Sequence, residues 1–234
     1  MSESDVEEEV HPASPQDRND DNFLTLLELL QEFQLTHIET DRPVTIVVRR
    51  RHILKSACAA LGRTYFEWQR EPQIEFMQEM ANDYGGPKRE FLRLLMIDVQ
   101  GALGVFEGRP NDLFFTFDLA ALESKKYFNA GKLTAWSVAH GGPGPRSLNI
   151  DLFKLMCGQS APLAGLDIGV LLDYHQQDKL QKLKTCATEE DLATLKTSCG
   201  DWVSGCGVPT FFNATLLELP QVVERMVANF IFHR

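Results

Sequence analysis

The chain has 234 residues, of which 44% are apolar, and a formal net charge of −10. The apolar share supports a buried core and argues against wholesale disorder, while the acidic balance argues against nucleic-acid binding, which needs a basic surface. No run of about 18 apolar residues occurs, so no membrane span is expected.

Residues 1–22 hold most of the acidic excess. They contain eight acidic residues and one basic residue, a net charge of −7, which leaves −3 for the rest of the chain. Without an aromatic residue this segment cannot bury enough surface to fold by itself, so we expect a disordered acidic tail. It is either a solvated leader or an interaction or phosphorylation segment. Nothing in it resembles a secretory signal, so we expect an intracellular protein, cytoplasmic or nuclear, whose five cysteines are free thiols.

The first third of the chain alternates helical and strand patterns. Apolar spacing predicts a helix over residues 23–35, capped by Asn22. The β-branched run at 44–48 predicts a strand, and a second helix follows to about residue 66. Residues 71–80 fit a strand and a short helix equally well. The inner face of the second helix is predicted to hold Ile53, Leu54, Ala57, Cys58 and Leu61.

The middle of the chain contains a helix start and a hairpin. Pro87 suits the first turn of a helix, where its missing N–H would be unpaired in any case. Apolar runs at 105–107 and 113–117 flank Gly108–Asp112 and predict a hairpin with a loop longer than two residues. Asp118 then suits the cap of a helix that ends at Gly131.

Capping signals continue to the end of the chain. Ser147 suits the cap of a helix running to Cys157, Thr188 begins another helix, and Pro220 begins the last one. The apolar positions of that last helix are 222, 223, 226, 227, 230 and 231. The sequence therefore predicts a mainly α-helical fold with short β elements (α+β), a disordered tail at 1–22 and one folded unit at 23–234.

Three kinds of chemical site are disfavoured. No phosphate-cradling glycine loop occurs. His140-Gly141-Gly142-Pro143 is like the oxyanion strand of lipases, but the chain lacks the Gly-x-Ser-x-Gly turn that such hydrolases need. A zinc site built from His175, Cys186, Cys199 and Cys206 would have twelve and six residues between its cysteines, whereas zinc ligands usually come in close pairs. We expect buried thiols there, and no cofactor or metal.

The strongest local signal is the run Asp83-Tyr84-Gly85-Gly86-Pro87-Lys88-Arg89-Glu90-Phe91. Its glycines allow a backbone path that other residues resist, Pro87 begins a helix, and Phe91 anchors that helix to a core. We expect these glycines to be structural rather than chemical. The order of Asp83, Gly85, Gly86, Arg89, Glu90 and Phe91 resembles the Asp-x-Gly-Gly-x-x-Arg-Glu-Phe motif in the amino-terminal lobe of HECT-type ubiquitin ligases.

Other segments extend the resemblance over residues 45–234. Val47–Arg51 occupies the place of an arginine-containing strand–helix unit. Ile74–Glu79 replaces a Val-x-Phe-x-Gly-Glu segment, with Gln78 in place of the usual glycine. The later segments resemble a divergent branch of the family, that of the G2/M-phase-specific ubiquitin ligases. They are Phe106–Gly108, Tyr127–Gly131, Trp136–Pro143 and Ala187–Leu192.

The resemblance implies a lobe that docks a ubiquitin-conjugating enzyme but does not carry the catalytic cysteine. In the family that cysteine lies in a later carboxy-terminal lobe and accepts ubiquitin as a thioester. We expect the chain to end before that lobe, on the order of 100 residues, begins. Cys186 follows a threonine, as the family's cysteine does, but it lies in a helical pattern. No residue is therefore predicted to be catalytic, and the chain is expected to bind without transferring ubiquitin.

The partner-binding residues are predicted between Ser147 and Pro209. In the family a smaller helical subdomain of this lobe holds the conjugating enzyme in a shallow apolar groove, and exposed aromatic residues are the usual anchors of such contacts. Tyr174 and Trp202 are the candidates, although both could be core residues, and for Trp202 that alternative is the stronger. Ubiquitin itself is a further candidate partner. The competing hypothesis is a catalytically inactive protein-interaction module derived from a HECT domain.

Overall fold

The structure is a computed structural model that describes residues 24–79 and 85–233. The strands are β1 (Glu39–Val48), β2 (Arg70–Phe76), β3 (Phe106–Arg109) and β4 (Asp112–Phe115). The α-helices are α1 (Leu26–His37), α2 (Ile53–Leu61), α3 (Gly86–Gly101), α4 (Leu119–Glu123), α5 (Lys126–Ala139), α6 (Ile150–Met156), α7 (Tyr174–Thr185), α8 (Glu189–Gly205) and α9 (Leu219–Ala228). Short 3₁₀ turns are η1 (Arg50–His52), η2 (Leu163–Gly165), η3 (Gly169–Leu171), η4 (Pro209–Asn213) and η5 (Leu216–Glu218), and Asn229–His233 forms a π-helical turn. The predicted class, mainly α with short β elements, is confirmed.

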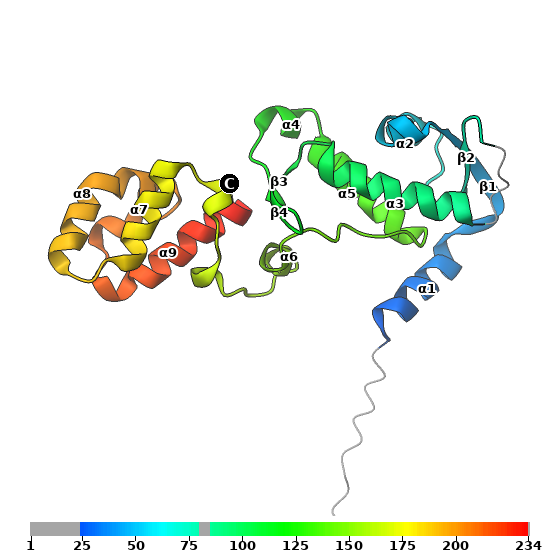
Figure 1. Ribbon diagram of the computed structural model, residues 1–234. Helices are drawn as coiled ribbons and strands as arrows, with labels where there is room; N and C mark the ends of the chain where they lie inside the picture. The colour runs from blue at the N-terminus through cyan, green and yellow to red at the C-terminus, as the bar shows by residue number, and fades with distance from the viewer. Residues whose placement is uncertain (1–23, 80–84, 234) are drawn as a thin grey trace, which may run out of the picture.

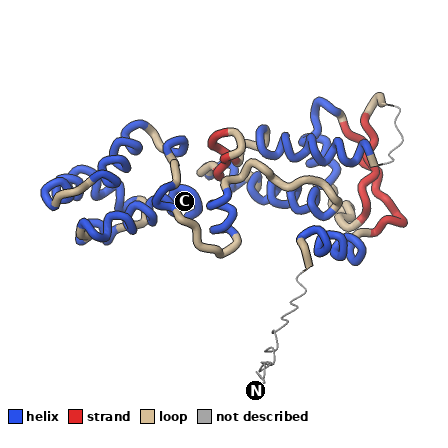
Figure 2. The backbone as a smooth tube through the Cα atoms, turned by 60° about the horizontal axis from the view of Figure 1, so that its bottom comes forward, coloured by secondary structure: helices blue, strands red, loops and turns tan. Residues whose placement is uncertain are grey.

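The buried apolar residues form two separate clusters. The sheet cluster comes from β1, α2, β2, α3 and α5, between Ile46 and Trp136. The helical cluster joins Phe114 and Leu152 to the buried residues from Leu163 to Ile231. Figure 1 shows these clusters at opposite ends of the molecule, with β3, β4 and α6 between them, and Figure 2 shows the same separation from another side.

A parallel strand pair organises the sheet cluster. β1 and β2 pair with Ile46 opposite Ile74 and Val48 opposite Phe76, and α2 lies in the connection between them. A parallel pair needs such a crossover because its strands run in the same direction. Alternate residues of β2 are buried, so residues 71–76 form a strand and not a helix. The pairing with β1 and the alternating burial therefore decide between a strand and a short helix, which the sequence pattern of this segment fitted equally well.

Helix α2 differs from its prediction in the position of one side chain and in its length. Ile53, Ala57, Ala60 and Leu61 are buried, but Cys58, predicted to face inward, is exposed. The helix ends at Leu61 rather than near residue 66, and Gly62 follows as its C-cap.

The helical cluster is held by α7, α8 and α9. All six apolar positions predicted for the last helix, at 222, 223, 226, 227, 230 and 231, are buried, which confirms their common face. Thr188 caps α8 as predicted, because its side chain accepts a hydrogen bond from the backbone N–H of Asp191. Pro220 lies in the first turn of α9, also as predicted.

Several helix starts differ from the prediction because other side chains make the caps. Thr25 caps α1 through a reciprocal capping box with Glu28, so this helix begins later than predicted; the expected cap, Asn22, lies outside the described residues. Asn149 rather than Ser147 caps α6, and its side-chain amide also donates to Asp112 over 2.7 Å.

The segment from β3 to α5 departs further from its prediction. The strands extend to Arg109 and Asp112, so the hairpin turn has two residues, and Asn111 takes a φ of 66° there. Asp118 caps a helix as predicted, but that helix ends at Glu123. Lys125 breaks it with a φ of 58°, and Gly131 lies inside the next helix, α5.

Candidate functional site

The run at 85–91 forms the start of helix α3. Gly85 caps α3 with a φ of 93°, a backbone conformation that side chains other than glycine resist. Pro87 lies in the first turn, and Phe91 is fully buried with its ring edge against Trp136, their centroids 6.2 Å apart. Asp83, the first residue of the motif, lies outside the described residues.

Charged residues of this run form ion pairs, and Lys88, which is partly buried, pairs with Glu71 over 2.7 Å. Glu90 pairs with Arg93 on the same helix and with Arg50, which also holds Glu79 and lies 4.2 Å over the ring of Phe76. Hydrogen bonds from Arg93 lower the pKa of Glu90, and those from Arg50 lower the pKa of Glu79. Because these groups are exposed, the network orients side chains more than it adds stability. Arg89 is exposed beside it.

Tyr174 lies on the surface of the helical cluster. It is the first residue of α7, directly after Asp173, whose carboxylate accepts from the N–H of Gln176 over 2.8 Å. Gln176 returns the contact by accepting from the Asp173 N–H over 3.2 Å, which completes a capping box. The ring of Tyr174 is 79% exposed. The cap therefore holds an exposed aromatic ring at a rigid helix end.

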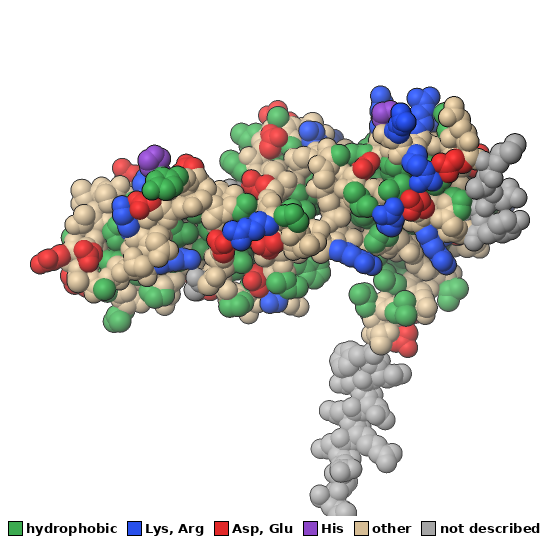
Figure 3. Space-filling view, in the orientation of Figure 1, with side chains coloured by type: hydrophobic (Ala, Val, Ile, Leu, Met, Phe, Trp, Pro, Cys, Tyr) green, Lys and Arg blue, Asp and Glu red, His purple; other side chains and the backbone are tan. Residues whose placement is uncertain are grey.

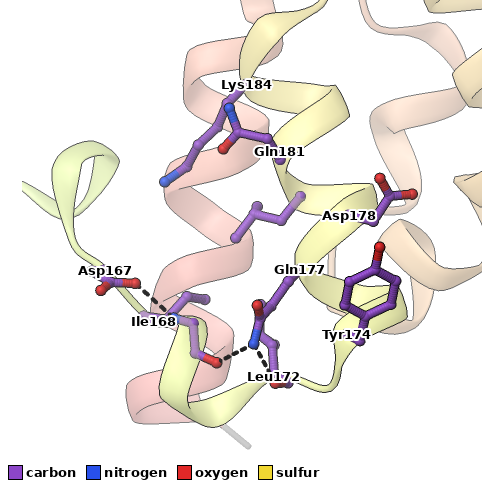
Figure 4. A pocket seen from close by; sticks show the side chains of 10 residues that line it. Asp167, Ile168, Leu172, Tyr174, Gln177, Asp178, Gln181 and Lys184 are labelled. Carbon is purple, nitrogen blue, oxygen red and sulfur yellow. Dashed lines mark hydrogen bonds between the residues drawn. The ribbon is translucent and has the colours of Figure 1, made fainter.

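A cavity of about 400 Å³ lies beside Tyr174, between α7 and the turn η3. Figure 4 shows the side chains of Tyr174, Gln177 and Gln181 along one edge of this cavity. Gln177 binds the two elements together, because its side-chain amide donates to the carbonyl oxygens of Gly169 over 2.7 Å and Leu172 over 2.9 Å.

Asp167 closes the other edge of the cavity. One of its carboxylate oxygens accepts from the N–H of Gly169 over 2.9 Å, and the other accepts from Arg109 of β3 over 3.0 Å. The hydrogen bond from Gly169 is the main cause of a lowered pKa for Asp167, with Arg109 adding to it. The cavity is thus lined by carboxylates, amides and a lysine around a small apolar floor.

Trp202 occupies a different environment. It is half-buried on α8 against the helical cluster, with its ring 6.3 Å from that of Phe230. The Lys179 ammonium lies 5.6 Å from the centre of the indole ring. Trp202 does not line the cavity beside Tyr174. Of the two predicted anchors, the structure therefore leaves Tyr174 exposed and packs Trp202 against the core.

The apolar groove predicted between Ser147 and Pro209 is not formed by the leucines of that segment. Its leucines mostly fill the helical cluster, whereas Ile150, Phe153 and Met156 of α6 and Val170 are exposed. The cavity is lined instead by polar residues that the prediction missed: Asp167, Gln177, Asp178, Gln181 and Lys184. The signal for them was present, because positions 174, 177, 178, 181 and 184 recur at helical spacing on one face of α7.

None of the five thiols is placed as an activated nucleophile would be. Burial raises the pKa of the thiols of Cys58, Cys199 and Cys206, which disfavours the thiolate. Cys186 ends α7, and its thiol hydrogen bonds to the Thr188 carbonyl oxygen over 3.7 Å. Cys157, the C-cap of α6, is exposed.

Across residues 24–79 and 85–233, no three His, Cys, Asp or Glu side chains converge as metal ligands would. Within that part of the chain no helix has the length and apolarity needed to cross a bilayer.

Comparison with known proteins links the chain to ubiquitin ligases. It is 27% identical over 167 residues to the G2/M phase-specific E3 ubiquitin-protein ligase of Homo sapiens, a match covering 69% of this chain and 23% of that protein. The protein of that name from Macaca fascicularis gives the same identity and coverage. The Gallus gallus protein is 31% identical over 131 residues, covering 54% of this chain and 17% of the relative. No family model matches the chain. The chain thus spans less than a quarter of the length of these curated relatives, to which it is related at low identity.

Proposed function

We propose that this chain is a docking module of the ubiquitin pathway, a HECT-type amino-terminal lobe whose helical cluster binds a ubiquitin-conjugating enzyme. The similarity to proteins named as E3 ubiquitin-protein ligases supports the pathway. The observation that carries the docking role is Tyr174, an aromatic ring that is 79% exposed, held by a capping box and set beside a cavity. Exposed aromatic residues next to a pocket are typical anchors of protein interfaces.

The polar lining of the cavity indicates how such a partner is selected. Asp167 and Asp178 offer carboxylates, and Lys184 offers an ammonium group, around the apolar Ile168 and Leu172. A partner loop with one apolar side chain and flanking polar groups complements this surface. Such an interface is small, so we expect a transient complex of micromolar affinity.

The test is a titration of the labelled chain against a panel of ubiquitin-conjugating enzymes. Replacing Tyr174 by alanine is expected to weaken binding by about 2 kcal/mol, or roughly 30-fold, as for an interface anchor. Tyr65→Ala is the matched control, because Tyr65 is 75% exposed but belongs to the other end of the molecule. Absence of binding at high micromolar concentration, or equal losses for both variants, would contradict the proposal.

The environment of the thiols favours a second candidate, a module that binds but does not transfer ubiquitin. Desolvation raises the pKa of the thiols of Cys58, Cys199 and Cys206 and so disfavours the thiolate, although Lys179 and Lys182 act against this at Cys199. We therefore expect no ubiquitin thioester when the chain is incubated with activating enzyme, the conjugating-enzyme panel and ubiquitin. A reducible ubiquitin adduct that disappears in one Cys→Ala variant would overturn this.

A further inference from the structure

Helix α1 has an apolar face that no part of the described chain covers. None of its residues is buried, and Leu26, Leu29 and Phe33 recur at helical spacing on one exposed side. The residues that approach the body are Leu30 and Gln34, and both are only partly buried. Figure 1 shows α1 projecting from the body. An isolated 12-residue helix is only marginally stable in water. We therefore expect the apolar stripe of α1 to pack against another surface.

A basic groove without an occupant lies on the same end of the molecule. It has a volume of about 470 Å³ and runs between α3 and the glycine-proline loop at 141–146. Arg89, Arg93 and Arg146 line it, and its apolar surface includes Ile97 and Pro143. Arg93 is paired with Glu90, whereas Arg89 and Arg146 have no acidic partner among the described residues. Figure 3 shows basic side chains on the body near the base of α1.

The loop wall of this groove is held rigidly. The buried Ser137 hydroxyl donates to the Pro143 carbonyl oxygen over 2.8 Å, and the Ser147 N–H donates to the side-chain oxygen of Gln100 on α3 over 3.2 Å. Gly142 lies so close to α3 that an added Cβ would come within 2.8 Å of Leu92. The groove is therefore a preformed surface, which lowers the entropic cost of binding.

We propose that this groove binds helix α1 of a second copy of the chain, in a two-fold symmetric exchange. The charges are complementary, because Glu28 and Glu32 are the only charged residues between 24 and 38, and arginines line the groove. The groove is long enough for the stripe, since Leu26 to Phe33 spans about 10 Å of helix and Arg89 to Gln100 about 16 Å. This proposal goes beyond the docking function and does not depend on it.

The position of α1 beside the groove suits a two-fold exchange. Gln34 of α1 approaches Gly141, which also lines the groove: its side-chain nitrogen lies 3.7 Å from the position of an added Cβ. An isologous interface needs the donated helix and the receiving groove close to the same axis, so that each contact is made twice. One short helix in one groove is a small interface, and its repetition is expected to give a reversible dimer of micromolar affinity.

The experiment is sedimentation velocity of the full chain from low to high micromolar concentration. The wild type is expected to shift from monomer to dimer. Phe33→Asp, which places a carboxylate on the apolar stripe, and Ile97→Asp, which places one in the groove, are expected to weaken association on the order of tenfold or more. Both residues are exposed, so circular dichroism should be unchanged. Leu217→Asp is the matched control, because Leu217 is 90% exposed on the helical cluster.

A mixing experiment separates exchange from a general loss of folding. The Phe33→Asp chain keeps its groove and the Ile97→Asp chain keeps its helix, so the two together retain one intact contact. We expect a heterodimer in the mixture, weaker than the wild-type dimer, although each variant by itself is monomeric. Arg146→Glu should weaken association, and adding Glu32→Arg should restore part of it. A wild type that stays monomeric, variants that associate like the wild type, or a mixture without heterodimer would each overturn the proposal.

Discussion

The two ends of the molecule use their apolar residues differently. In the helical cluster the leucines of α7 and α8 are buried, and the exposed face of α7 is a polar stripe with one tyrosine at its end. In the sheet cluster a comparable core is closed by Phe91 and Trp136, but α1 beside it keeps its leucines exposed. A continuous apolar stripe on a helix without buried residues therefore marks α1, whereas a cavity with a polar lining marks the exposed face of α7. The two ends are suited to different kinds of contact.

The largest loss of stability is expected when a large buried side chain is removed from one of the two hydrophobic clusters. Phe91 and Phe211 are both fully buried, one in each cluster. Replacing either by alanine is expected to destabilise its own cluster by about 3–5 kcal/mol, because each substitution leaves a cavity. Hydrogen exchange measured by mass spectrometry should show faster exchange mainly in the cluster that carries the substitution. Equal acceleration at both ends would show that the clusters unfold as one unit, and the comparison would then fail.

A smaller effect is expected at the start of α3. Gly85 has a positive φ, so Gly85→Val should cost about 1–3 kcal/mol of strain and lower the melting temperature. Gly86 is a matched control, since it has no positive φ and an added Cβ meets open space. From the sequence alone, both glycines were expected to have a structural role. Of the two glycines only Gly85 has a positive φ in the structure, so only its replacement should strain the backbone. Equal melting temperatures for the Gly85→Val and Gly86→Val variants would contradict this.

The two ends should also respond to acid in different pH ranges. In the sheet cluster, burial lowers the pKa of His140 below its ordinary 6.5, and one of its ring nitrogens donates to the Trp68 carbonyl oxygen. In the helical cluster the pKa of Asp167 lies below its ordinary 3.8. In both cases the unfolded chain binds the proton more readily, so stability falls as the pH drops from the ordinary pKa towards the folded one.

Acidification should therefore loosen the sheet cluster first. Hydrogen exchange near His140 is expected to quicken just below pH 6.5, and exchange around the turn η3 only below pH 3.8. Asp167→Asn should remove the second response and leave the first. The Asp167 effect is expected to be small, because its side chain is largely exposed. A reversed order of the two responses would contradict these assignments.

The smallest effect is expected from deleting residues 1–22. The deletion removes no large apolar group, so no cavity forms in either core and the melting temperature should hardly change. Differential scanning calorimetry of the full and shortened chains is the measurement. A large drop would show that this segment packs against one of the two ends, and the predicted disorder would then be wrong.

The sequence by itself determined the elements whose signals are local. The six apolar positions of the last helix, the helix start at Pro87 and the cap at Thr188 all follow from helical spacing or from one side chain reaching a nearby N–H. Such signals need only a few neighbouring residues to act, although at α6 the side chain of Asn149 makes the cap in place of Ser147. The general class, helices with a few short strands, followed from them.

The tertiary structure decided whatever depended on distant partners. Residues 71–76 became a strand because β1 lies beside them, and Trp202 became half-buried because Phe230 packs against it. The arginine groove joins segments far apart in the chain, such as Arg89 and Arg146, and the ion pair between Arg109 and Asp167 links β3 to the cavity beside Tyr174. A pattern in the sequence records which side chains are apolar or charged. Only the packing of the elements decides which of them remain exposed and face the same space.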